Sequence, residues 1–93
     1  MKSRTTAKFR KAFSQLPKEV QEQARKAYRQ FQEDPGHPGL RFKRVHPKLQ
    51  IYSARASKDY RAVGLRDGDT IVWFWIGTHA DYDLLLSQGN FSI

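Results

Sequence analysis

Four polar side chains in the second half of the chain could carry out chemistry. His79 follows shortly after an apolar run and can act as an acid or a base, because an unperturbed imidazole titrates at about 6.5. Arg55 and Arg61 are always charged and can hold a phosphate group with two parallel hydrogen bonds. Tyr82 can stack on a nucleic-acid base or take part in proton transfer. Together these residue types indicate acid–base chemistry on an anionic substrate.

Each of these residues also has a purely structural interpretation. His79 can cap a helix or bond to Asp83, and a strand arginine can pair with Asp59. Tyr82 can pack against a sheet at the start of a helix. Alternation in a strand gives both arginines apolar neighbours on their own faces, so the sequence leaves open which face of the sheet carries them.

Two helices are the first of the elements that must position these side chains. Apolar residues at helical spacing predict a helix over residues 6–16, with Thr5 or Thr6 as its N-cap. Pro17 interrupts this helix and suits the first turn of a second one. The second helix carries one apolar stripe, formed by Val20, Ala24, Ala27, Tyr28 and Phe31. Two amphipathic helices joined at a proline indicate a helical hairpin.

The rest of the chain reads as a small sheet and a last helix. Breaker residues predict a loop at 34–39, after which the hydrophobic period changes to two. Strands are predicted at 40–43, 49–55, 60–65 and 70–76, with a tight hairpin turn at 67–69. The strand at 70–76 is apolar on both faces, so it should be covered on both sides. Residues 81–86 predict a short C-terminal helix that Gly89 ends. The expected fold class is α+β, a helical hairpin packed on a mostly antiparallel, twisted sheet of about four strands.

Composition sets further bounds. The chain has 93 residues, no cysteine and a net charge of +8, so we expect one domain over residues 1–93 and no disulfide framework. Residues 1–31 carry +7, residues 32–58 carry +4 and residues 59–93 carry −3. The basic part indicates an anionic partner, unless it only keeps the domain soluble. The longest apolar run has six residues and no signal segment is recognisable, so we expect a cytoplasmic protein without a membrane partner.

The order of several motifs resembles the RelE/ParE superfamily, the toxins of bacterial type II toxin–antitoxin systems. The strongest motifs are Tyr52-Ser-x-Arg55 followed by Tyr60-Arg61, and Gly77-x-His79-x-x-Tyr82-Asp83. The similarity covers essentially the whole chain and implies a RelE-like fold. It departs from the family at residues 2–5, which lack alternating apolar residues. The first edge strand of the family should therefore be short or absent here.

The resemblance implies one of two activities. RelE-like members are ribosome-dependent endonucleases that cut messenger RNA without a metal and leave a 2′,3′-cyclic phosphate, whereas ParE-like members inhibit DNA gyrase and are not enzymes. His79 favours the endonuclease, since an inhibitor needs no acid–base residue at that place. A binding module without activity is a third interpretation. The expected partners are a cognate acidic antitoxin and the ribosome with its messenger RNA, or DNA gyrase on the alternative reading.

The resemblance also assigns roles to residues. The predicted catalytic residues are His79, Arg61, Arg55 and Tyr82, and the predicted RNA-binding residues are Lys43, Arg44 and His46. Arg41 and Lys48 are interpreted as solvated charges and His37 as structural. No cofactor is implied. His79, Asp81 and Asp83 have metal-ligand chemistry, but we predict no metal site, because the chain has no cysteine and no second histidine stands close by in sequence.

Overall fold

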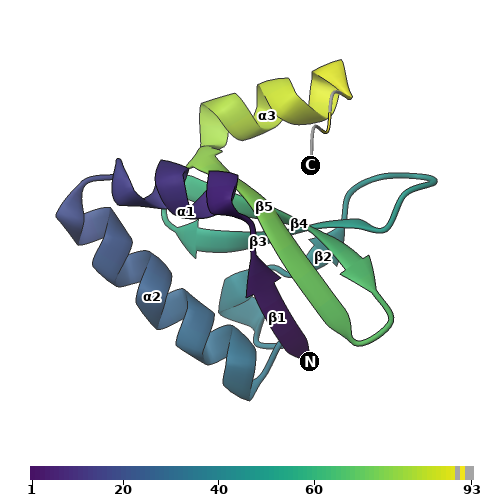
Figure 1. The fold of residues 1–93 in the computed structure, drawn as a ribbon, viewed down its shortest axis with the longest axis horizontal. Coiled ribbons are helices and arrows are strands. Elements are labelled where there is room, and N and C mark those ends of the chain that lie inside the picture. The colour runs from purple at the N-terminus through teal and green to yellow at the C-terminus, as the bar shows by residue number, and fades with distance from the viewer. Residues whose placement is uncertain (90, 92–93) are drawn as a thin grey trace.

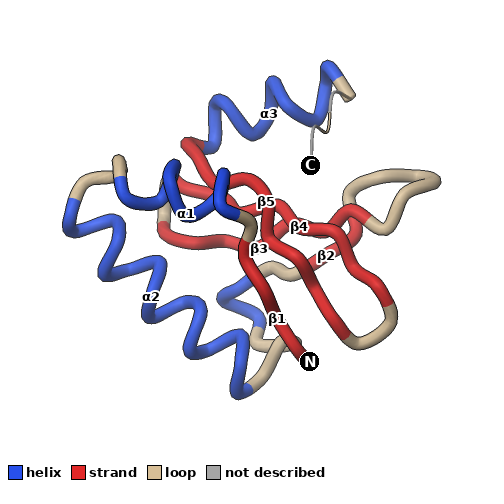
Figure 2. Tube along the Cα trace, in the orientation of Figure 1, coloured by secondary structure: helices blue, strands red, loops and turns tan. Residues whose placement is uncertain are grey.

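Residues 1–89 and 91 are the part of the chain that the computed structural model describes. Their elements are β1 (Lys2–Thr5), α1 (Ala7–Ser14), α2 (Lys18–Glu33), the 3₁₀-helix η1 (Pro38–Leu40), β2 (Lys43–Arg44), β3 (Ile51–Ser57), β4 (Tyr60–Asp67), β5 (Thr70–Thr78) and α3 (His79–Gln88). The strands form one sheet in the order β1-β5-β4-β3-β2, as Figures 1 and 2 show. The α+β class is confirmed. Within this part of the chain no helix is long and apolar enough to span a membrane.

The edge strand β1 is present, so the described residues form five strands where about four were predicted. β1 runs parallel to β5, from the pair Lys2 with Thr70 to the pair Thr5 with Trp73. All the other strand pairs are antiparallel. A hydrogen bond between the hydroxyls of Ser3 and Tyr28 ties β1 to α2. A short polar strand can form here because backbone bonds to β5, rather than an apolar face, hold it in place.

The strand predicted at 40–43 is wrong except for its last residue. Pro38 opens η1 instead, and the side chain of Leu40 is buried in the core. Arg41 then takes a left-handed backbone conformation with φ 48° and ψ 40° and turns the chain toward β2. The alternation of apolar and basic residues that suggested a strand therefore comes from a helical turn followed by a reversal.

Capping residues set the ends of α1 and α3. Thr6 is the N-cap of α1, as predicted, and its hydroxyl accepts a hydrogen bond from the backbone N–H of Phe9 at 3.0 Å. This helix ends at Ser14, two residues earlier than expected. α3 starts two residues earlier than expected, because the hydroxyl of Thr78 accepts from the N–H of Asp81 at 3.2 Å. His79 is therefore the first residue of a helix.

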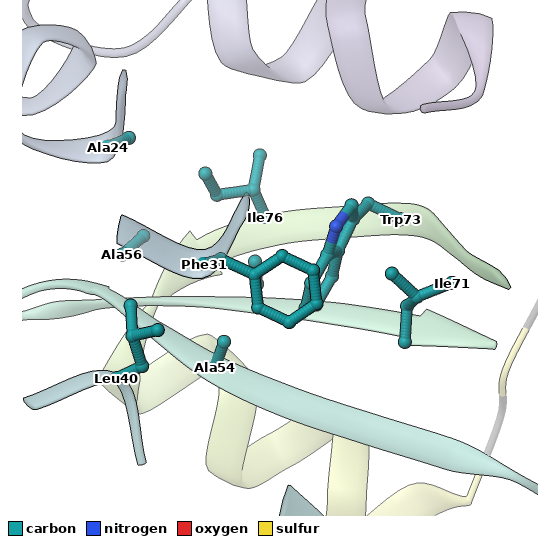
Figure 3. Close-up of a cluster of buried hydrophobic side chains, with 9 residues drawn as sticks. Ala24, Phe31, Leu40, Ala54, Ala56, Ile71, Trp73 and Ile76 are labelled. Atoms are coloured by element: carbon teal, nitrogen blue, oxygen red, sulfur yellow. The ribbon is translucent and has the colours of Figure 1, made fainter. Parts of the chain in front are cut away.

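The main core lies between the helical hairpin and one face of the sheet (Figure 3). Phe31 of α2 is 2% exposed and meets the rings of Phe42 and Trp73 edge-on, at centroid distances of 5.0 and 5.4 Å. Small residues face these rings from the strands, among them Ala54 and Ala56. The apolar stripe predicted for the second helix thus packs on the sheet.

A second cluster covers the opposite face beneath α3, and consists of Ile51, Val63, Phe74 and Tyr82. A bulge between β4 and β5 pairs Val63 with Trp75 but Gly64 with Trp73, which leaves Phe74 as the extra residue. A Cβ on Gly64 would lie 2.9 Å from the side chain of Trp73, so the close approach needs glycine. β5 is therefore covered on both faces, as its apolar sequence predicts.

Candidate anion-binding and acid–base site

The register of β3 and β4 sets Arg55 directly opposite Arg61. Residues paired across two strands lie on the same face of the sheet, as do residues two positions apart along one strand. The pair Ser53 with Val63, two positions along from the two arginines, packs beneath α3. Both arginines therefore lie on the α3 side of the sheet, which the sequence left open. Like charges in directly opposed positions destabilise a sheet, so this pair favours an anionic ligand between its guanidinium groups.

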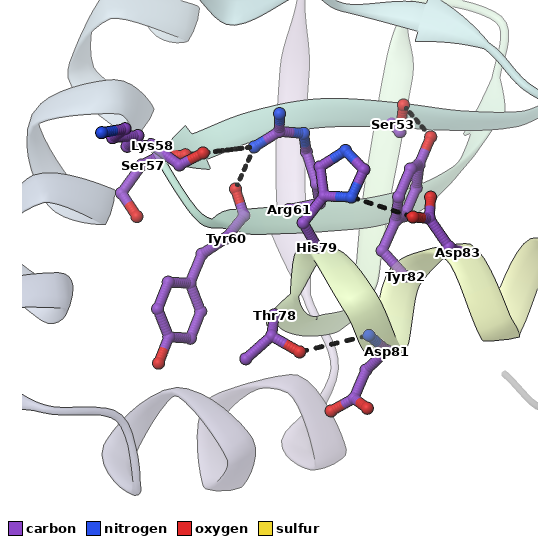
Figure 4. Close-up of polar contacts among 10 residues, drawn as sticks. All are labelled: Ser53, Ser57, Lys58, Tyr60, Arg61, Thr78, His79, Asp81, Tyr82 and Asp83. Carbon is purple, nitrogen blue, oxygen red and sulfur yellow. Dashed lines mark hydrogen bonds and ion pairs between the residues drawn. The ribbon is translucent and has the colours of Figure 1, made fainter.

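The guanidinium group of Arg61 is anchored by the turn that joins β3 to β4. Its Nη1 donates to the carbonyl oxygens of Ser57, Lys58 and Tyr60, at 3.1, 3.4 and 2.9 Å (Figure 4). Within the described residues all its hydrogen bonds use Nη1, which leaves the donors on Nε and Nη2 for a ligand. The sequence suggested Asp59 as a structural partner, but it is turn carbonyls that hold this side chain.

Arg61 also lies in a positive environment. Burial lowers its pKa, and so do the charges of Arg55 and Arg41, while Tyr82 and Asp59 act in the opposite direction. Arg41 itself is exposed, in agreement with its interpretation as a solvated charge.

His79 stands at the edge of this group, in the first turn of α3. Its backbone N–H donates to the carbonyl of Asp59 at 2.7 Å, which joins the start of α3 to the β3–β4 turn. Its Nδ1 lies 3.1 Å from Oδ2 of Asp83, and the two side chains are 49% and 63% exposed (Figure 4). The bond to Asp83 that the sequence offered as a structural alternative is thus present. It leaves Nε2 of the imidazole for a substrate.

The ring of Tyr82 is buried, whereas stacking on a base requires an exposed ring face. The residue is 6% exposed, and its hydroxyl donates to the hydroxyl of Ser53 at 2.9 Å. Its ring packs in the cluster beneath α3, 6.5 Å from the ring of Trp75 and 5.8 Å from that of His79. No face of this ring is open to a base, so the geometry matches the packing interpretation. Ser53, which the sequence analysis did not single out, anchors Tyr82 and with it the first turn of α3.

Replacing Tyr82 with phenylalanine should cost stability rather than activity. The hydroxyl of Ser53 would lose its partner in a buried position, which costs about 1–2 kcal/mol. Urea unfolding should show this loss, and the double variant with Ser53→Ala should be less destabilised than the two single losses together. The activity of the site should stay close to the wild-type level. A fall of about 100-fold in a folded Tyr82→Phe variant would assign proton transfer to the phenol instead.

The three predicted RNA-binding residues differ in their surroundings. Arg44 donates to the carbonyls of Leu49, Lys48 and Pro47 at 3.3, 3.1 and 3.4 Å. Nδ1 of His46 accepts from the N–H groups of Lys48 and Leu49 at 3.0 and 2.8 Å. Both side chains shape the loop between β2 and β3.

Lys43, in contrast, is exposed and pairs with Ser53, so it lies on the same face as the two arginines. RNA contact by Lys43, Arg44 and His46 stays a prediction. In residues 1–89 and 91 no three His, Cys, Asp or Glu side chains are grouped as metal ligands would be.

Comparison with known proteins adds a family and a fold. The family model of the ParE-like toxin domain matches residues 18–83, more than half of the chain. The chain is similar to a solved RelB–RelE antitoxin–toxin complex from Methanococcus jannaschii, with a TM-score of 0.69, 18% identity, and coverage of 87% of this chain and 96% of that one. No curated protein sequence matches.

Two further solved structures share the fold. A YoeB/ParE toxin from Agrobacterium tumefaciens matches with a TM-score of 0.64 and 14% identity, over 85% of this chain and 99% of that one. The intact E. coli RelBE toxin–antitoxin complex matches with a TM-score of 0.62 and 18% identity, over 83% of this chain and 94% of that one. At these identities the likeness concerns the fold, and it confirms the predicted RelE-like arrangement.

Proposed function

Because the chain belongs to the ParE-like toxin domain family, and so to the RelE/ParE superfamily of toxins, we propose that it is a ribosome-dependent messenger RNA endonuclease. The observation that carries this proposal is the meeting of Arg55, Arg61 and His79 where α3 begins. RNA cleavage by the neighbouring 2′-hydroxyl needs cations that stabilise the phosphate charge and a group that transfers a proton. Two guanidinium groups and an imidazole can supply both.

In the proposed reaction the 2′-hydroxyl of the message attacks its own phosphate and gives up its proton to a base supplied by solvent or the ribosome. Arg55 and Arg61 bind the non-bridging oxygens, where negative charge accumulates in the transition state. Protonated His79 donates from Nε2 to the 5′-oxygen as the bond from phosphorus to that oxygen breaks. The products are a 2′,3′-cyclic phosphate and a free 5′-hydroxyl.

A gyrase inhibitor is the second candidate, which the description of the matched family favours. Expression without antitoxin separates the two, if message ends and plasmid supercoiling are mapped in the same cells. The endonuclease should produce new message ends with cyclic phosphates at ribosome-occupied sites and leave supercoiling unchanged. Altered supercoiling with intact message would establish the inhibitor instead.

An acidic antitoxin is the proposed protein partner. The M. jannaschii and E. coli structures are complexes of a toxin with its antitoxin, which supports such a partner here. A cavity of about 400 Å³ opens between the helical hairpin and the sheet. Its lining combines aromatic side chains, Phe9, Phe13 and Tyr28, with Arg25 and Arg29. Such a lining suits an amphipathic segment with acidic residues beside apolar ones.

The association rate with this antitoxin should fall steeply with salt. Residues 1–58 carry a net charge of +11, and the Debye length shrinks from about 10 Å at 0.1 M to about 3 Å at 1 M. The dissociation rate should stay nearly constant, because apolar burial holds the complex. Stopped-flow kinetics at several salt concentrations measure both. An association rate indifferent to salt would mean that the antitoxin docks by apolar contacts alone.

A further inference from the structure

Small side chains account for the cavity of about 400 Å³ between the helical hairpin and the sheet. Its lining includes five alanines from α2, β3 and β4, namely Ala24, Ala27, Ala54, Ala56 and Ala62. α1 contributes the rings of Phe9 and Phe13, and none of its residues is fully buried. Because alanines face one another across the space between α2 and the sheet, the two layers enclose a hollow with apolar walls.

One buried hydrogen-bond donor at this cavity has no partner. Trp73 lines the cavity and is 4% exposed. In residues 1–89 and 91 its indole Nε1 is the one buried side-chain nitrogen or oxygen that makes no hydrogen bond. Figure 3 shows Trp73 beside Phe31, with the indole nitrogen on the side toward Ile76, which also lines the cavity. An unpaired N–H among apolar groups is unfavourable, so an oxygen acceptor placed in the cavity would stabilise the protein.

The charged side chains that line the cavity lie at its mouth. Arg10, Arg25 and Arg29 are exposed, and the guanidinium group of Arg25 lies over the ring of Phe13, 5.1 Å from its centroid. The buried part of the lining consists of apolar side chains, with Nε1 of Trp73 as its free donor. An apolar wall with a single donor favours an uncharged ligand that carries one acceptor.

We propose that this cavity binds a small, uncharged molecule with an apolar body and one carbonyl oxygen, which accepts a hydrogen bond from Nε1 of Trp73. A dry apolar cavity of about 150 Å³ holds one benzene ring, so about 400 Å³ has room for a body of one or two rings. Binding of this ligand does not depend on the endonuclease activity. Because the antitoxin is proposed to dock at the same cavity, the ligand competes with it, and this consequence alone rests on the proposed function.

Two probes of nearly the same shape test for the hydrogen bond. Acetophenone carries a carbonyl oxygen where α-methylstyrene carries a methylene group, and both should bind in titrations followed by NMR. The indole N–H signal of Trp73 should move downfield with acetophenone but not with α-methylstyrene, because only the carbonyl oxygen accepts a hydrogen bond. Trp75 packs in the cluster beneath α3, on the other face of the sheet, so its indole N–H signal should stay in place.

Replacing Trp73 with β-(3-benzothienyl)alanine removes the donor and keeps the shape of the side chain, because sulfur takes the place of the N–H group. The affinity for acetophenone should then fall by about 2- to 10-fold, the factor that one hydrogen bond contributes to an equilibrium. The affinity for α-methylstyrene should not fall. Comparing the four dissociation constants isolates the hydrogen bond from the different hydrophobicity of the two probes. Thermal unfolding of the variant checks the fold.

Ala27→Leu tests the place of binding. Ala27 is half-buried on α2 and lines the cavity, so a leucine there takes up space that the ligand needs. Leucine is a good helix former, and the variant should fold and lose most of its affinity for both probes. Ala80→Leu is the matched control, because Ala80 is exposed on α3 and lies outside the cavity lining. It should bind both probes as wild type does.

Failure of the wild-type protein to bind either probe at millimolar concentration would overturn the inference and leave the cavity to the antitoxin segment. An unchanged affinity of the benzothienyl variant for acetophenone would overturn it too, as would wild-type binding of the probes by Ala27→Leu. A protein that cuts message but binds neither probe would leave the endonuclease standing without this site. A protein that binds acetophenone through Trp73 but cuts no message would leave the site standing without the endonuclease.

Discussion

Replacing His79 with alanine should slow message cleavage by about 100- to 10,000-fold, which is the usual contribution of a general acid or base. Stability should hardly change, since the side chain is 49% exposed and its one bond, to Asp83, lies in solvent. The backbone N–H that bonds to Asp59 is retained by alanine. Cleavage of a defined message on programmed ribosomes, with thermal unfolding of the same preparation, measures both quantities.

Asp83→Ala is the matched control for this variant. It removes the exposed bond to Nδ1 of His79 and leaves the imidazole in place, so its effect on cleavage should be far smaller. A fully active His79→Ala would remove His79 from the site. If that variant also kept its toxicity in cells with intact message, the gyrase inhibitor would be the better assignment.

Replacing Arg61 with alanine should reduce cleavage by about 100- to 1,000-fold, the range for loss of one preorganised group that stabilises transition-state charge. Arg61→Lys should recover only part of this rate. An ammonium group has no planar fork, so it cannot bond to the turn carbonyls through one nitrogen and bind phosphate through two others. The melting temperature of Arg61→Ala should change little, because the loss of the hydrogen bonds to the turn carbonyls opposes the relief of repulsion with Arg55.

Lys18→Ala, which removes an exposed charge at the start of α2, is the control for a general loss of positive charge. Its cleavage rate should match that of wild type. The cleavage rate of Arg55→Ala should fall, as that of Arg61→Ala does. Equal rates for Lys18→Ala, Arg55→Ala and Arg61→Ala would contradict phosphate binding at these arginines.

The candidate site could be named from the sequence in part. The motif order singled out His79, Arg55 and Arg61, and the structure brings these residues to the junction of β3, β4 and α3. Alternation could not tell which face carries the arginines, because both faces of β3 and β4 contain apolar residues. The face became clear only from Ser53 and Val63, which pack beneath α3.

The packing of Tyr82 and the backbone turn at Arg41 could not be predicted, because each depends on contacts between distant segments. Tyr82 has the same type and spacing whether its ring is exposed or buried, and its burial follows from a hydroxyl 29 residues earlier, on Ser53. The backbone turn at Arg41 was not expected, because the alternation of residues 40–43 imitates a strand. Residues 38–40 instead form a helical turn that buries Leu40, and the left-handed backbone of Arg41 reverses the chain after it.

By itself the sequence determined the α+β class, the helical hairpin, the tight turn before β5 and the two-sided burial of β5. These features follow from local rules, namely hydrophobic period, proline and glycine positions and capping residues, which act over a few residues of chain. Only the tertiary structure decided that β1 pairs parallel with β5, that Phe74 is the bulge residue, and that Arg55 lies opposite Arg61. Strand register and bulges depend on how side chains from separate segments fill one core, so residues far apart in sequence must be packed before the site exists.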